Sequence, residues 1–361
     1  MTINTNLYLD LYVLQSVPPS NLNRGVDGAP KSAMFGGFKR TRVSSQSWKH
    51  AMRTYFATHH QPNSNRTVHV PEMLAHALQA LDPALDYEDA LDKAEETLKA
   101  AKITGIAKDH TTKAMLSVTS AQIEAVARYA STTSKLDKKE LQTLLLGDRT
   151  LDLELFGRMV ADNQELTIDG VSQVAHAISV NAVSPEFDYF VAMDDLQPED
   201  QQGAFKIGET EYNSSTLYRY ANLNLHQLIA DLGPEVAVQG MKDFVQAFIL
   251  SMPTGKQNSY ANKTLPSYIM AVLRTDTPVN LVNAYEAPVE VDDNGYLKES
   301  VDRLQTAYRK AQKLTDKPLY RVALALDEQV ESDADAANLT DLTVQLAAKI
   351  NEVTGDEISN D

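Results

Sequence analysis

The start of the chain places a buried strand, a long glycine-containing loop and an amphipathic helix one after another, and this order restricts the possible folds. Residues 6–14 are rich in aromatic and branched side chains, which predicts a largely buried strand that ends at Pro18 and Pro19. The loop over 15–43 is too long to be idle in a compact domain, so we expect it to carry function. A helix is predicted over about 44–58.

The predicted helix has two faces of different character. Ser44 or Ser45 can cap the free amides at its start. Apolar side chains recur at helical spacing and should face a core: Trp48, Ala51, Met52 and Tyr55. Polar and basic side chains share another side: Gln46, Lys49 and Arg53.

Basic side chains are concentrated in this loop and helix. Between residues 22 and 56 there is one acid, Asp27, against seven cations: Arg24, Lys31, Lys39, Arg40, Arg42, Lys49 and Arg53. The whole chain has a formal net charge of -16, and charges that serve solubility alone would be spread out. Lys49 and Arg53 are four residues apart, where like charges destabilise a lone helix by roughly a few tenths of a kcal/mol. A bound phosphate would reverse that effect, so the segment is interpreted as a docking surface for anions.

Periodicity assigns the rest of the chain to helices and strands. Strands are predicted at 151–159, 171–183, 187–193, 217–225, 268–273 and 319–326. Helices are predicted at 71–81, 84–102, 119–146 (as two helices), 235–252, 300–314 and 339–353. Between 60 and 150 there is no strand signal, and Thr119 with Gln122 and Asp137 with Glu140 are typical of capping pairs. The polar, acidic segment 194–216 is expected to be an extended hairpin.

Several sequence motifs resemble those of one protein family. Asn-Arg follows the first strand, then Phe-Gly-Gly, then Arg-Val-Ser-Ser-Gln-Ser, then Lys49 and Arg53. Further matching runs are Gly157–Met159, Ala175–Ile178, Met193–Gln197, Tyr218–Asn222 and Gly255–Gln257. Together they are similar to the signature of the backbone (CasC) subunit of type I-E CRISPR Cascade complexes, in the RAMP superfamily. Residues 60–150 and the tail after 327 match only in length and helical character.

The periodicity of the sequence does not determine the topology by itself. The resemblance implies an α+β fold. It implies a ferredoxin-like, RRM-type palm with a helical insertion called the fingers and a projecting β-hairpin called the thumb. The implied parts are the first half of the palm with the basic loop and helix (1–60), the helical fingers (61–150), palm strands (151–193), the thumb hairpin (194–216), the second half of the palm (217–326), and an acidic C-terminal helix and tail (327–361).

The resemblance also implies roles for individual residues. The guide RNA would be contacted by Arg24, Lys31, Arg42, Ser44, Gln46, Lys49, Arg53, Met159 and Lys256. Met159 would wedge beside a base, although a methionine after a strand is more often a core residue. Lys138 and Lys139 would contact target DNA, against the alternative of a solvated helix face. Phe205 is expected at the thumb tip.

The implied function is that of a non-catalytic subunit that stacks in a helical filament along a guide crRNA and leaves its bases free to pair with a target DNA strand. Other partners would be the large, small, 5′-handle-binding and crRNA-processing subunits of Cascade. No cofactor or metal is expected, since the eight histidines lack metal-ligand spacing and the chain has no cysteine. The polar start and the lack of a long apolar run favour a cytoplasmic protein with no membrane partner.

Two alternatives remain open from sequence. Related backbone subunits of type III complexes cut RNA with an aspartate in the equivalent loop, so Asp27 could make the chain a metal-dependent endoribonuclease. A turn residue before Gly28 is an adequate explanation of the same aspartate. A weaker third reading is a monomeric module that binds single-stranded RNA.

Overall fold

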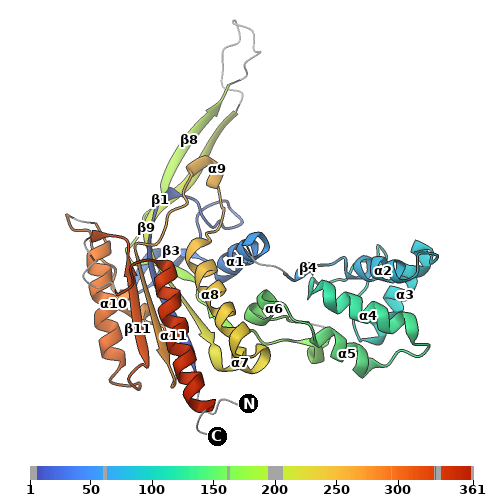
Figure 1. The fold of residues 1–361 in the computed structure, drawn as a ribbon. Coiled ribbons are helices and arrows are strands. Elements are labelled where there is room, and N and C mark those ends of the chain that lie inside the picture. The colour runs from blue at the N-terminus through green and yellow to red at the C-terminus, as the bar shows by residue number, and fades with distance from the viewer. Residues whose placement is uncertain are drawn as a thin grey trace, which may run out of the picture. The chain divides into compact units, whose positions relative to one another are not determined.

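The computed structural model describes residues 6–59, 63–160, 163–193, 206–293, 295–328, 330 and 335–358 (Figure 1). The chain divides into two compact units, which are described separately. Unit 1 comprises residues 1–55 and 173–361, and unit 2 comprises residues 56–172. Among the described helices, none has the length and apolar character needed to cross a membrane.

Unit 1 is built on an antiparallel sheet with the order β11-β10-β1-β9-β7-β3-β2, and β6 and β8 also pair with β9. The strands are β1 (Tyr8–Ser20), β2 (Ser32–Phe35), β3 (Phe38–Val43), β6 (Ser172–Val174), β7 (Ala177–Ser179), β8 (Glu186–Ala192), β9 (Lys206–Asn224), β10 (Tyr268–Arg274) and β11 (Tyr320–Ala325). The α+β class is therefore confirmed, with an antiparallel sheet.

The central strand β1 is buried along most of its length, as its composition predicts. The prediction that Pro18 and Pro19 end this strand is wrong, because β1 continues to Ser20. The pairing of β1 with β9 shifts register between Val17 and Ser20. Proline has no amide to donate to a ladder, and an irregularity of this kind accommodates it.

Helices cover both faces of the sheet. Tyr12 of β1 and its cross-strand partner Tyr220 point to the face covered by α10 (Leu297–Ala311) and the short η3 (Val282–Tyr285). The neighbouring Arg219 points to the other face, where it stacks on Trp48 of α1 (Ser45–His59) and Phe248 of α8 (Pro234–Leu250). The remaining helices of unit 1 are α7 (Leu225–Leu232), α9 (Gln257–Tyr260) and α11 (Leu339–Ile358).

Unit 2 has a helical core of its own. Its elements are β4 (Asn65–Thr67), α2 (Val70–Leu81), α3 (Tyr87–Ala100), β5 (Leu116–Val118), α4 (Ser120–Thr132), α5 (Lys138–Leu146), α6 (Leu151–Phe156) and η1 (Gln164–Leu166). The predicted caps are confirmed: Thr119 and Gln122 form a capping box, and Asp137 accepts from the amides of Lys139 and Glu140. The prediction that residues 60–150 contain no strand is wrong, because β4 and β5 lie in this range and pair with each other.

The strand predicted at 151–159 is wrong, because this stretch begins as helix α6. Its alternation of leucine with Asp152 and Glu154 mimics a strand with one solvent face. Both carboxylates are instead buried, Asp152 with hydroxyl donors from Ser64 and Thr150, and Glu154 with Arg149. The segment 171–183 is likewise two short strands, β6 and β7, rather than one.

The strand β9 is longer than expected, and its first part pairs with β8 to form the β8–β9 arm that is seen in Figure 1. It runs without a break from Lys206 to Asn224, so the separate strand predicted at 217–225 is only its second half. Its first seven residues pair with β8, which agrees with the strand predicted at 187–193. The expected thumb tip, Phe205, lies outside the described residues.

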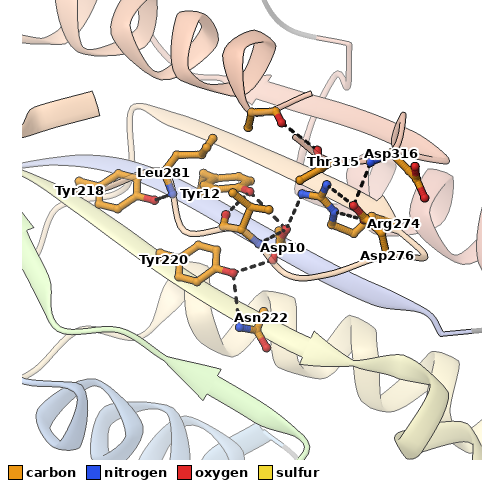
Figure 2. A network of polar contacts seen from close by, with 12 residues as sticks. Asp10, Tyr12, Tyr218, Tyr220, Asn222, Arg274, Asp276, Leu281, Thr315 and Asp316 are labelled. Carbon is orange, nitrogen blue, oxygen red and sulfur yellow. Dashed lines mark hydrogen bonds and ion pairs between the residues drawn. The ribbon is translucent and has the colours of Figure 1, made fainter. Parts of the chain in front are cut away.

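A buried polar network joins β1, β9 and β10 (Figure 2). The Asp10 carboxylate accepts hydrogen bonds from the Tyr220 hydroxyl at 2.7 Å, the Val279 amide at 3.1 Å and the Tyr12 hydroxyl at 3.3 Å. Arg274 Nη1 lies 3.6 Å from it. Burial still outweighs these contacts and raises the pKa of Asp10 to about 6.

We expect this carboxylate to make stability depend on pH. A raised folded-state pKa favours folding while the group is protonated, and that contribution is lost as pH rises through about 6. Relative to Asp10→Asn, the free energy of unfolding of the wild type should fall by up to about 3 kcal/mol between about pH 4 and pH 7. Urea unfolding at several pH values measures this. A difference between the two proteins that stays constant with pH would contradict it.

Candidate anion-binding surface

The loop that follows β1 is held in place by two asparagines. The buried Asn21 donates to the carbonyl oxygens of Gly28 at 2.8 Å and Glu211 at 2.9 Å. The Asn23 side-chain oxygen accepts from the Ser44 amide at 3.0 Å. The exposed Arg24 therefore sits on a loop that is fixed both to β9 and to the start of α1.

The Gly36-Gly37 pair forms the turn between β2 and β3. Both residues have positive φ, 59° and 83°, as a two-residue type I′ hairpin turn requires. A Cβ on Gly36 would lie 1.7 Å from the Glu286 carbonyl oxygen. The pair thus lets one backbone approach another.

The strand β3 contains two arginines with different environments. Arg40 is fully buried and donates to four carbonyl oxygens, of Ser179, Val180, Tyr285 and Glu286, at 2.9–3.1 Å. Burial lowers the pKa of its guanidinium. Counting Arg40 among the cations of the docking surface is therefore wrong, because it binds the framework.

Arg42, two residues later, is only half-buried and lies near the end of β3, three residues before α1 begins. Its Nη1 is 3.1 Å from Nδ1 of His176, an exposed residue next to β7. Lys31 is also close enough to act on the pKa of this histidine. The structure thus brings Lys31 and Arg42 together, as the sequence predicts for a basic surface, and it adds His176.

The start of α1 completes the surface. Ser44 is the capping residue, with its hydroxyl 3.4 Å from the Ser47 amide. The apolar face is confirmed for Trp48, Ala51 and Met52, which are buried, whereas Tyr55 is half-buried and Phe56 is buried. On the other side Gln46 is exposed, and Lys49 and Arg53 are half-buried. Partial burial lowers the pKa of the Lys49 ammonium, so a nearby anion would stabilise its charged form.

Lys256 lies at the root of the β8–β9 arm. Gly255 packs so closely on the backbone of Leu22 that a Cβ would lie 2.0 Å from the Leu22 carbonyl oxygen. The Lys256 ammonium donates to the Thr210 hydroxyl at 3.2 Å. This contact places the lysine beside β9, on a segment packed against the loop that carries Arg24.

Asp27 occupies a turn of the same loop. Its carboxylate accepts from the Ala29 amide at 3.1 Å, and the intervening Gly28 has a positive φ of 83°. The side chain is exposed. Within the described part of the chain, no group of three or more histidine or acidic side chains is arranged to hold a metal ion.

Unit 2 contains three further residues named from sequence, Met159, Lys138 and Lys139. Met159 is 83% exposed, whereas the preceding Arg158 is buried and donates to the carbonyls of Leu166 and Leu145. Burial lowers the pKa of Arg158 to about 10. The structure therefore separates a framework arginine from an accessible methionine within the Gly157–Met159 run.

The two lysines at the start of α5 have unequal environments. Lys138 forms an ion pair of 2.5 Å with Glu165, which also accepts from Gln142 at 2.8 Å. This pairing lowers the pKa of Glu165. Lys139 is exposed. Of the two lysines predicted to contact DNA, Lys138 forms the ion pair with Glu165, and Lys139 acts on the pKa of Glu165 through its charge.

Comparisons with known proteins cover almost the whole chain. The family model described as "CT1975-like protein" matches residues 9–352. A solved chain of a "CRISPR RNA-guided surveillance complex, pre-nicking" is 25% identical, with a TM-score of 0.82, over 95% of this chain and 100% of that one. A chain of a "CRISPR RNA-guided surveillance complex" is 22% identical, with a TM-score of 0.71, over 94% and 99%. Comparison with curated proteins gives no match.

Proposed function

Since the chain belongs to the CT1975-like protein family, we propose that it is the non-catalytic backbone subunit of a type I-E CRISPR surveillance complex and holds the guide RNA on the surface around α1. The family match and the solved structures confirm the resemblance to Cascade backbone subunits that the sequence motifs indicate.

The observation that carries the RNA-binding proposal is the grouping of cations along one continuous segment. One side of the segment from the end of β3 through α1 presents Arg42, Gln46, Lys49 and Arg53, next to the buried cap Ser44. The fixed loop beside them presents Arg24 and Lys31. Lys256 adds a cation at the base of the arm. Contacts of this kind to phosphates position a strand without reading its sequence, which suits a protein that must hold any guide.

We also propose which parts of the chain form the palm, the fingers and the thumb. The elements β1, α1, β7, β9, α8 and β10 follow the βαββαβ order of a ferredoxin-like palm. Unit 2 contains the proposed fingers, with Met159 as the side chain that wedges beside a base. The β8–β9 arm is the proposed thumb. Its first strand begins at Glu186, before the start at residue 194 that is expected from the sequence. Copies would stack along the crRNA in the cytoplasm, leave its bases free to pair with target DNA and join the other Cascade subunits.

The salt dependence of binding tests the backbone contact. If one subunit neutralises about five phosphates, the log-log slope of RNA affinity against salt should be near -3.5, at about 0.7 per contact. Lys49→Ala and Arg53→Ala should each reduce the slope by about 0.7 for every RNA sequence. Fluorescence anisotropy with a short single-stranded RNA measures this. Lys298→Ala, whose lysine pairs with Asp302 on α10, is the matched control. A loss that depended on RNA sequence would contradict the proposal.

Shortening the arm tests the proposed thumb. Asp188 and Thr210 are cross-strand partners, so replacing residues 189–209 by Asn-Gly closes a two-residue hairpin between them. The deleted arm carries exposed side chains such as Tyr189, 64% accessible, so the melting temperature should change little. Short RNA should still bind. Electron microscopy on long RNA should show that regular filaments are lost, and normal filaments would rule out the thumb assignment.

The paired state of Lys138 predicts an order of effects on DNA association. Lys139→Ala should slow association of the guide-loaded complex with duplex DNA at low salt more than Lys138→Ala does, because Glu165 already neutralises Lys138. Glu165→Gln should release Lys138 and speed association. Stopped-flow fluorescence measures these rates, and guide retention should stay unchanged. Equal rates for all the variants would indicate a solvated helix face.

A further inference from the structure

His176 lies in the proposed RNA-binding surface but has no role assigned by the sequence motifs. It immediately precedes β7, which pairs with β3 so that Ala177 is opposite Val43 and Ile178 is opposite Arg42. This pairing places the exposed imidazole 3.1 Å from the Arg42 guanidinium, through Nδ1 and Nη1. The histidine is therefore next to the last strand residues before the α1 cap.

The contact determines the state of the imidazole. A guanidinium can only donate hydrogen bonds, so Nδ1 of His176 must be the acceptor and carry no proton. This contact fits a neutral ring with its proton on Nε2. Partial burial, Arg42 on β3 and Lys31 before β2 all lower the pKa of His176. Among the described residues that act on this pKa, none is a carboxylate.

We infer that His176 is a further anion-contacting residue of this surface and takes up a proton when a phosphodiester of single-stranded RNA binds beside Arg42. The inference rests on the proposed RNA-binding function. Protonation at Nδ1 removes the acceptor for Arg42 and leaves two cations in contact. A phosphate oxygen between them would accept from both and supply the missing negative charge. The proton comes from the solvent, and no covalent bond to the RNA is made or broken.

A simpler role for His176 would be to hold the Arg42 side chain in one orientation. Glutamine separates the two roles, because its side-chain oxygen can accept from Arg42 but cannot take up a proton. His176→Gln should therefore keep the neutral contact and lose only the proton linkage. His69→Gln is the matched control, since His69 is an exposed histidine of unit 2 that contacts Glu72.

Isothermal titration calorimetry measures how many protons are taken up when the RNA binds. A single-stranded RNA of about 10 nucleotides is titrated into the full-length protein near pH 6.5, in two buffers of different ionisation enthalpy. A phosphodiester does not titrate in this range. Wild type and His69→Gln should take up as much as about one proton per bound subunit, and His176→Gln correspondingly less. Between about pH 8 and pH 6, wild-type affinity should rise on the order of tenfold more than that of His176→Gln.

The outcomes separate this inference from the proposed function. If wild type binds RNA with the expected salt slope but His176→Gln takes up as many protons, the histidine only orients Arg42 and the inference is wrong. If wild type takes up no proton, the inference is also wrong, while the proposed function stands. If wild type does not bind the RNA, the proposed function itself fails.

Discussion

The surface around α1 depends on one buried cation, Arg219 of β9. Its guanidinium lies 3.7 Å from the centre of the Trp48 ring and 4.6 Å from that of Phe248. It donates to Gln15 at 2.6 Å and to the Phe248 carbonyl oxygen. Burial lowers the pKa of Arg219 to about 9. Burying this charge is costly, and the two rings and two acceptors offset that cost only when α1, α8 and the sheet are all in place.

Buried arginines recur as framework residues in both units. Arg40 joins β3 to the β7 end and to the chain at 285–286, and Arg158 joins segments of unit 2 through carbonyl oxygens. Each guanidinium offers five donors in a fixed plane, so one side chain can bind carbonyls from several segments that are distant in the chain. The basic segment and the Gly157–Met159 run thus mix such framework residues with accessible ones, as in Arg40 near Arg42 and Arg158 beside Met159.

Sequence could predict the parts that local spacing determines. The period of Trp48 and Met52 identifies the packed side of α1, and Thr119 with Gln122 identifies the α4 cap. It could not distinguish Arg40 from Arg42, because their burial depends on a carbonyl cluster from distant segments. It also failed at α6, where buried carboxylates imitate a solvated strand face. The proposed role of His176 depends on a contact across 134 residues, which the pairing of β3 with β7 creates.

The length of β9 has a mechanical consequence. This strand has 19 residues and changes partners at Asn213, from β8 to β1, without leaving the extended conformation. Asn21 and Lys256 also contact it near that position, at Glu211 and Thr210. The arm is therefore a continuous extension of a strand of the central sheet, and it is held in place at its base. The backbone of the arm continues into the stretch that carries Arg219 and Tyr220, so a force on the arm would act on the packing of α1 and on the Asp10 network.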